Sequence, residues 1–297
     1  MNNHTQVECT MNPLRSCLVS VLTLAALGCH GDAVTNPPAI HKAGIHYVNA
    51  VPDTMQQDVR IMDIVSNSGL FDANFRTYDM FYKDIEAGTR HVRIFLSSTD
   101  PAVTSTVLFD TSYSFTEGQD YTFIHAGFAR SGQTPRRAVW IVQDNTPAPG
   151  AGQVGFRFIH GGAGLGPVDV NLIRHGSDTL PDAPLIANVA YGTVGTYLTM
   201  KADSFQVQLS GNVVYYDTLR VVVTAAGTKT PALFTATAPL GVPGTPLVNP
   251  IGGAAIPGSV LTALMVPPSV AGSPAPPTFT TPTALYLVDR RPPDTTP

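Results

Sequence analysis

The feature that most constrains the fold is an internal repeat, because motifs of the first half of the chain recur in the second half. Ile45–Asn49 aligns with Phe156–His160, and Asp58-Val59 aligns with Asp169-Val170, so that both pairs share an offset of 111 residues. Further paired segments are Tyr82–Gly88 with Tyr197–Asp203, Gly118–Ile124 with Gly258–Leu264, and Trp140–Asp144 with Tyr286–Arg290. Such a repeat indicates two copies of one structural unit.

Both halves consist of short runs that are typical of β-strands. Val92, Ile94 and Leu96 alternate with residues 91, 93 and 95, and the same period of two runs through 121–126. From Ile45 onward, no segment keeps apolar residues at helical spacing. The 26 glycines and 26 prolines provide frequent turns. We therefore predict an all-β chain of two tandem antiparallel β-sandwiches, each with about seven strands.

A Pro/Gly-rich segment, Asn145–Gly152, separates the two repeats and has the composition of a linker. The second repeat is longer than the first because it contains Pro/Gly-rich insertions, which we expect to form exposed loops. The predicted organisation is a signal peptide at 1–28, a tether at 29–43, one sandwich at 44–147, a linker at 148–153, a second sandwich at 154–291 and a tail at 292–297.

Several motifs are similar to a bacterial family named domain of unknown function 4397. Asn49–Asp53 followed by Asp58-Val59 resembles its Asn-Ala-Ser-Pro-Asp strand end and Asp-Val strand, and Ala190–Val194 resembles its Tyr-Gly-Thr turn. The first repeat lacks a clear Tyr-Gly-Thr, and the second has His160–Ala163 in place of Asn-Ala-x-Pro. The resemblance implies immunoglobulin-like sandwiches in exported, often lipid-anchored proteins, and it implies no established activity.

The N-terminal residues have the features of an export signal. After Arg15, the uncharged segment Cys17–Leu27 suits the apolar core of a signal peptide and is shorter than the roughly 20 residues of a membrane span. Ala25–Cys29 resembles the lipobox of bacterial lipoproteins, which predicts lipid attachment at Cys29 and a membrane-anchored protein facing the periplasm or the cell surface. The alternative is an ordinary cleaved signal with Cys29 as an incidental thiol. Either Met1 or Met11 can be the start, and Met11 gives the better basic region.

Charge and cysteine content argue against several classes of partner. The net charge is −4, and the adjacent basic pairs are limited to Arg136-Arg137 and Arg290-Arg291, which is too little to neutralise a run of phosphates. We therefore expect no nucleic-acid partner. The three cysteines all lie within the first 29 residues, so the remainder of the chain contains neither disulfides nor cysteine-based zinc sites.

We predict no catalytic residues, no metal site and no cofactor. No histidines lie in i, i+2 or i, i+4 pairs, Gly-x-Ser-x-Gly does not occur, and the glycines at 161–166 lead into a strand rather than a helix. Asp58 and Asp169 are expected to bind backbone groups. The alternative is a hydrolase whose acidic site is assembled from loops, for which the candidates are Asp53, Asp58 and Glu117.

The predicted function is a non-enzymatic binding or adhesion module of the bacterial cell envelope, with an envelope protein or glycan as its ligand. Tyr215 and Tyr216 are adjacent on a predicted strand, so one of them can present a flat aromatic surface to a sugar or peptide, although packing in a core is the commoner role. A purely structural envelope spacer without a specific ligand is the main alternative. The ligand and the oligomeric state stay open.

Overall fold

The computed structural model describes residues 40–63, 69–176, 178–203 and 217–294, together with the backbone of two short strands at 207–209 and 213–215. The predicted signal peptide, the lipid site at Cys29, Tyr216 and the side chain of Tyr215 lie outside the described residues. Within the described part of the chain, no helix is long and apolar enough to cross a membrane.

The first half of the chain forms a β-sandwich, here called sandwich 1, from two four-stranded sheets. Inner sheet 1 has the order β4-β1-β7-β8, and outer sheet 1 has the order β3-β2-β5-β6. The bounds of these strands are β1 Lys42–Ala50, β2 Gln57–Ile61, β3 Leu70–Ala73, β4 Lys83–Glu86, β5 Gly88–Leu96, β6 Val107–Phe115, β7 Asp120–Ala126 and β8 Ala138–Asp144. A single helical turn, α2 (Pro101–Thr104), connects β5 to β6.

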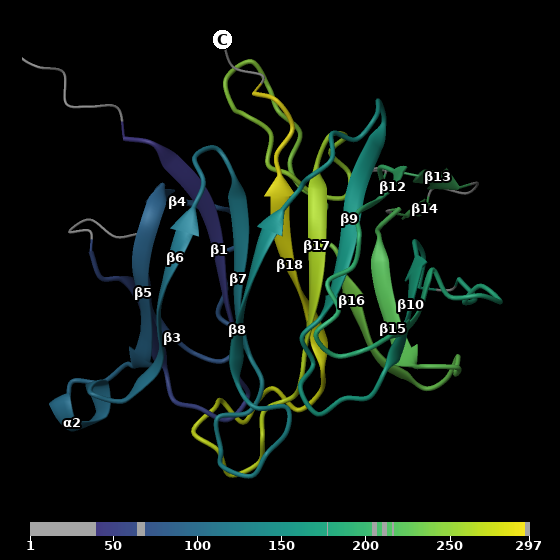
Figure 1. The fold of residues 1–297 in the computed structure, drawn as a ribbon. Helices are drawn as coiled ribbons and strands as arrows, with labels where there is room; N and C mark the ends of the chain where they lie inside the picture. The colour runs from purple at the N-terminus through teal and green to yellow at the C-terminus, as the bar shows by residue number, and fades with distance from the viewer. Residues whose placement is uncertain are drawn as a thin grey trace, which may run out of the picture. The chain divides into compact units, whose positions relative to one another are not determined.

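The second half forms sandwich 2 with the same strand order at every position (Figure 1). Inner sheet 2 is β12-β9-β17-β18, and outer sheet 2 is β11-β10-β15-β16. The bounds are β9 Gln153–His160, β10 Val168–Ile173, β11 Ile186–Val189, β12 Leu198–Lys201, β15 Arg220–Ala225, β16 Ala232–Thr237, β17 Val260–Val266 and β18 Thr283–Arg290. A hairpin of β13 (Val207–Leu209) and β14 (Val213–Tyr215) is inserted between β12 and β15.

The all-β fold class with sandwich architecture is thus confirmed, with one correction to the predicted antiparallel pairing. β1 pairs with β7 in parallel, and β9 pairs with β17 in the same way. Parallel neighbours need a long crossover, and here the chain passes through the outer sheet before it returns beside the first strand. Local alternation within a strand does not reveal the direction of its partner.

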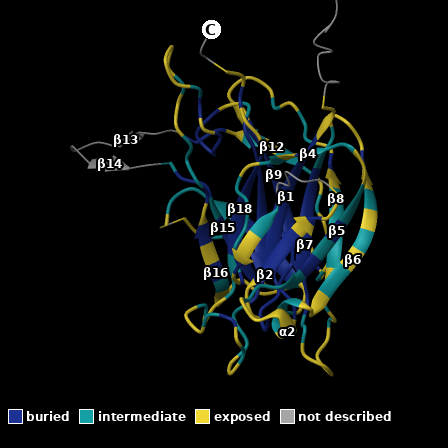
Figure 2. Ribbon diagram, turned by 90° about the vertical axis from the view of Figure 1, so that its left-hand side faces the viewer, coloured by how far each residue is buried: buried dark blue, intermediate teal, exposed yellow. Residues whose placement is uncertain are grey.

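Each sandwich has its own apolar core, and a third apolar cluster joins the two inner sheets. Residues at alternate positions of β1, such as Ile45 and Tyr47, face the core of sandwich 1. The intervening Val48 and Ala50 pack with Ile124 of β7 and with Leu264 of β17. The central strands of the inner sheets, β1, β7, β9 and β17, are therefore buried on both faces, as the dark blue strands in Figure 2 show. The result is four sheets stacked in the order outer 1, inner 1, inner 2, outer 2.

Candidate functional site

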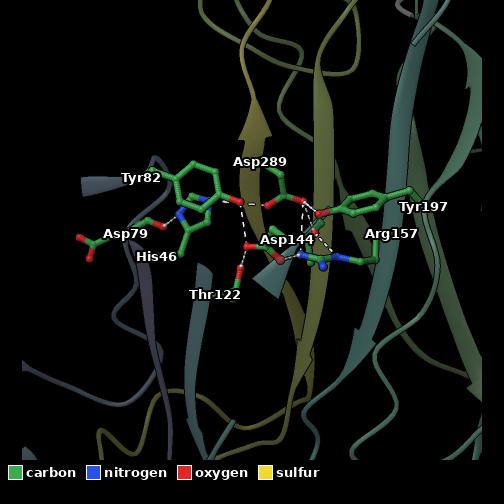
Figure 3. Close-up of polar contacts among 9 residues, drawn as sticks. His46, Asp79, Tyr82, Thr122, Asp144, Arg157, Tyr197 and Asp289 are labelled. Atoms are coloured by element: carbon green, nitrogen blue, oxygen red, sulfur yellow. Dashed lines mark hydrogen bonds and ion pairs between the residues drawn. The ribbon is translucent and has the colours of Figure 1, made fainter. Parts of the chain in front are cut away.

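A cluster of polar side chains, here called the interface cluster, lies between the two inner sheets beside the apolar contacts (Figure 3). Period-two alternation places six of its members on the strand faces that are turned toward the opposite sheet, while its two tyrosines, Tyr82 and Tyr197, lie just before β4 and β12. Sandwich 1 contributes His46, Tyr82, Thr122 and Asp144, and sandwich 2 contributes Arg157, Tyr197, Thr262 and Asp289. The Asp144 and Asp289 side chains have no exposed surface, and that of Arg157 is 3% exposed.

Two carboxylates form the centre of the interface cluster, and each is bound by hydroxyl groups of its own sandwich. Asp144 Oδ2 accepts hydrogen bonds from Tyr82 Oη at 2.8 Å and Thr122 Oγ1 at 2.6 Å. Asp289 Oδ2 accepts one from Tyr197 Oη at 2.9 Å and another from Thr262 Oγ1. The two halves of the cluster therefore have the same arrangement of tyrosine, threonine and aspartate.

The basic members of the interface cluster reach across to the opposite sandwich. Arg157 Nη2 lies 2.8 Å from Asp144 Oδ1, and its guanidinium covers the Tyr197 ring with 4.4 Å to the ring centroid. His46 Nε2 lies 3.6 Å from Asp289 Oδ1. His46 Nδ1 is 3.0 Å from the carbonyl oxygen of Asp79, which can only accept, so Nδ1 carries a hydrogen. The aligned positions 46 and 157 thus make equivalent cross-interface contacts.

Burial determines the electrostatics of the interface cluster. It raises the pKa of Asp144, and the charge of Asp289 adds to this rise, while Arg157 and the hydroxyl donors oppose it. Burial lowers the pKa of Arg157, but Asp289 and Asp144 outweigh this effect and raise the pKa overall. Burial is also the main cause of the raised pKa of Tyr82. Arg157 thus offsets part of the cost of burying the two carboxylates between the sandwiches.

The acids proposed for a hydrolase site bind separate partners. Asp53 accepts hydrogen bonds from the backbone N–H groups of Ala129 at 2.8 Å and Arg130 at 2.9 Å. Asp58 accepts one from the N–H of Asp72 at 2.9 Å. Glu117 is exposed and forms an ion pair with His41 at 2.6 Å. The structure does not bring Asp53, Asp58 and Glu117 together around a common cavity.

Asp58 and Asp169 have the backbone role that the repeat predicts for both. Asp169 Oδ1 accepts from the N–H of Asn188 at 2.8 Å, which matches the bond from Asp72 to Asp58. Asp72 and Asn188 both have positive φ, 51° and 53°. Each aspartate therefore fixes a left-handed residue on the neighbouring strand, a conformation that non-glycine residues seldom adopt.

The histidines are distributed over the whole molecule. His91 pairs with Asp110 on outer sheet 1, and His125 is buried with its Nδ1 2.7 Å from Gln57 Oε1. His160 Nδ1 accepts from the N–H of Gly162, and His175 lies in the loop after β10. Across the described ranges, no group of three or more His, Cys, Asp or Glu side chains is arranged to hold a metal ion.

A groove of about 860 Å³ is present in sandwich 2. Its lining is mainly apolar and includes Leu172 of β10, Leu198 and Met200 of β12, and Leu185 in the loop before β11. β11 and β12 are edge strands of the two different sheets, so these residues mark the side at which sandwich 2 is open. Arg174 and Tyr197 add polar groups to the wall.

Comparison with known proteins confirms the family resemblance over part of the chain. Residues 43–171 match the family described as Domain of unknown function (DUF4397). The match covers all of sandwich 1 and extends through β9 into β10. A search of the curated proteins finds no match. The matched family carries no assigned activity.

Asp144 and Asp289 were not among the predicted site residues, because the repeat alignment placed the last strands one residue out of step. Ile124 and Leu264 occupy the same position in the two repeats. Strand pairing places Trp140 opposite Ile124 and Leu285 opposite Leu264, so Trp140 corresponds to Leu285 rather than to Tyr286. With this correction Asp144 corresponds to Asp289. The sequence signal that could have identified the interface cluster is this pair of acids, which both repeats carry at the end of the last strand.

Proposed function

We propose that the chain is a non-enzymatic binding module of the bacterial cell envelope, held at the membrane by a lipid on Cys29. The observation that carries the binding role is the apolar groove of sandwich 2. A volume of about 860 Å³ lies within the range of roughly 300–1,000 Å³ that is typical of ligand pockets. We propose that this groove binds the apolar part of its ligand, which is an envelope protein or a glycan-linked molecule.

The lining supports this assignment because it joins a large apolar surface to few polar groups. Leucine, methionine and proline side chains provide contact area, and area buried from water is the main source of affinity. Arg174 is held in position by Asp203, by Asp217 at 3.7 Å and by the carbonyl oxygen of Lys201 at 2.6 Å. A fixed guanidinium at the wall can orient a ligand that carries an acceptor group.

A matched pair of leucine substitutions tests the groove. Leu185 lines the groove and is 47% exposed, whereas Leu247 is 90% exposed and lies outside it. The soluble Cys29→Ser chain would be incubated with peptidoglycan, envelope polysaccharide and solubilised envelope proteins. We expect Leu185→Asp to abolish retention of the bound component and Leu247→Asp to preserve it. Equal retention by the two variants would remove the groove from the proposal.

The lipid anchor has its own test, since Cys29 lies outside the described residues. Replacing Cys29 with serine removes the thiol that would carry the acyl chains, and stable anchoring needs more than one chain. The variant should move from the membrane fraction to the soluble exported fraction. If detergent partitioning is the same for wild type and variant, the protein is not a lipoprotein.

The structural spacer is the second candidate, and the joined inner sheets favour it. Two sandwiches joined by apolar contacts can separate other envelope components without a ligand. Under this alternative, neither leucine variant alters retention, because no component is retained specifically. The groove experiment therefore distinguishes the two functions.

A further inference from the structure

A second cavity, of about 690 Å³, lies where β7, β18 and the segment after β18 meet. Four carboxylates contribute to its wall, together with two aromatic side chains: Asp84, Asp120, Asp289, Asp294, Phe81 and Tyr82. Arg290 and Arg291 also line it, so the wall carries an excess of two formal negative charges when all four acids are ionised. This acidic cavity shares none of its lining with the groove of sandwich 2.

Asp120 contributes a partly buried carboxylate to the wall of the acidic cavity. It is the first residue of β7, and within the described ranges its carboxylate forms no hydrogen bond or ion pair. Burial raises the pKa of Asp120, and the charges of Asp144, Asp289 and Asp84 raise it further, while His46 opposes them. A positive charge bound close to Asp120 would stabilise its ionised form.

Asp289 also lines the acidic cavity, and one of its carboxylate oxygens accepts no hydrogen bond. Its side chain has no exposed surface, and it forms part of the cavity wall. Oδ2 is fully used by hydroxyl donors, but Oδ1 accepts no hydrogen bond, and the closest basic atom is His46 Nε2 at 3.6 Å. Leaving a buried charged acceptor unsatisfied is costly, typically more than about 1–3 kcal/mol.

We propose that the acidic cavity binds an organic cation, an ammonium or guanidinium group, between Asp120 and the ring of Phe81, because the Tyr82 ring is stacked on His46 with 3.7 Å between the ring centroids. Carboxylates neutralise such a cation, and aromatic faces attract it. A bare metal ion fits less well, because no set of three ligating side chains converges among the described residues. The volume of the cavity is also that of a small molecule or a side chain rather than of an ion.

Titration with agmatine, which carries both an ammonium and a guanidinium group, tests the proposal directly. The soluble Cys29→Ser chain should bind it saturably at one site, and Asp120→Asn should weaken binding at least ten-fold. The matched control is Asp110→Asn, which removes a partly exposed carboxylate on outer sheet 1 and should leave binding unchanged. Absence of saturable binding, equal binding by Asp120→Asn, or displacement of agmatine by an equal concentration of Ca²⁺ would overturn it.

Two further measurements separate this site from folding effects and from the groove. Asp120→Asn removes an uncompensated charge, so its thermal midpoint at neutral pH should equal or exceed that of the parent chain; a lower midpoint would contradict the absence of a partner. Leu185→Asp should bind agmatine normally, because Leu185 does not line the acidic cavity. Loss of agmatine binding in Leu185→Asp would show that the cavity and the groove are one site.

Discussion

Arg157 is the residue on which the interface cluster depends most directly. Its Nη2 lies 2.8 Å from Asp144 Oδ1 and 3.5 Å from Asp289 Oδ2, and its Nε donates to Thr262 Oγ1 at 2.8 Å. Removing one partner of a buried ion pair leaves the other charge uncompensated in a medium of low dielectric. The arginine therefore contributes chiefly by preventing the penalty of two unpaired buried carboxylates.

Substituting Arg157 with methionine should lower the free energy of unfolding by about 3–5 kcal/mol, because Asp144 and Asp289 lose their shared cation. Arg93→Met is the control, since Arg93 forms a partly exposed ion pair with Asp110 at 2.7 Å and should cost no more than about 1 kcal/mol. Urea denaturation of the soluble chain measures both values. Similar losses for the two variants would mean that the cluster contributes little to stability.

His125 should make the protein sensitive to acid. Burial lowers the pKa of His125 to about 3, with a smaller contribution from Arg137, so the folded protein keeps this imidazole neutral. In the unfolded chain the imidazole takes up a proton below about pH 6.5. The unfolded state then binds more protons, and stability falls as the pH drops from about 6.5 towards 3.

The expected contribution of His125 is a slope of at most about 1.4 kcal/mol per pH unit in the free energy of unfolding. His125→Gln should lack this contribution, so its free energy of unfolding should fall less steeply with decreasing pH than that of the parent chain. This holds whatever the effect of the substitution on stability at pH 7. An unaltered slope in His125→Gln would show that His125 is protonated in the folded state.

At the level of strands, alternation predicted the outer sheets better than the inner ones. In β5, Val92 and Ile94 are fully buried while His91 and Arg93 face outward, as the period of two indicated. In the inner sheets, both faces are buried, and the polar side chains of one face meet another sheet. Polar residues such as Thr122 and Arg157 have the same pattern whether they face water or a buried partner, so alternation alone could not reveal the interface cluster.

Asp289 faces the interface because it continues the alternation of Leu285 and Leu287 along β18. The pairing of β17 with β18 becomes irregular only at this end of the strand, between Val260 and Leu261. Aligning Trp140 with Tyr286 instead placed Gln143 as the counterpart of Asp289, and a shift of one residue exchanges the two faces of a strand. The groove was equally hidden, because its lining comes from loops and strands far apart in the chain.

Over the whole molecule, the predicted domain boundaries are still to be tested, because residues 41–297 group as one compact unit. Each sandwich has a separate apolar core, which favours independent folding. The apolar contacts between the inner sheets and the interface cluster favour a coupled unit instead. Unfolding experiments can measure whether the two sandwiches unfold separately or as one coupled unit.

Trp140 provides the measurement, because it is the single tryptophan of the chain and lies at the joined inner sheets. Its ring centroid is 5.2 Å from that of Tyr191 in sandwich 2. If the sandwiches separate before they unfold, Trp140 fluorescence changes at lower urea than circular dichroism. We expect the two transitions to coincide in the full chain, since separation would expose the apolar contacts and leave Asp144 without Arg157.

A fragment of residues 41–147, which contains all of β1, completes the comparison. Its complete core predicts a β-type circular dichroism spectrum and a cooperative transition. Its midpoint should lie below that of the full chain, because Val48, Ile124 and Trp140 lose their cover, and Trp140 emission should be red-shifted by contact with water. A fragment without a cooperative transition would contradict independent folding, whereas one as stable as the full chain would contradict a stabilising role for the interface.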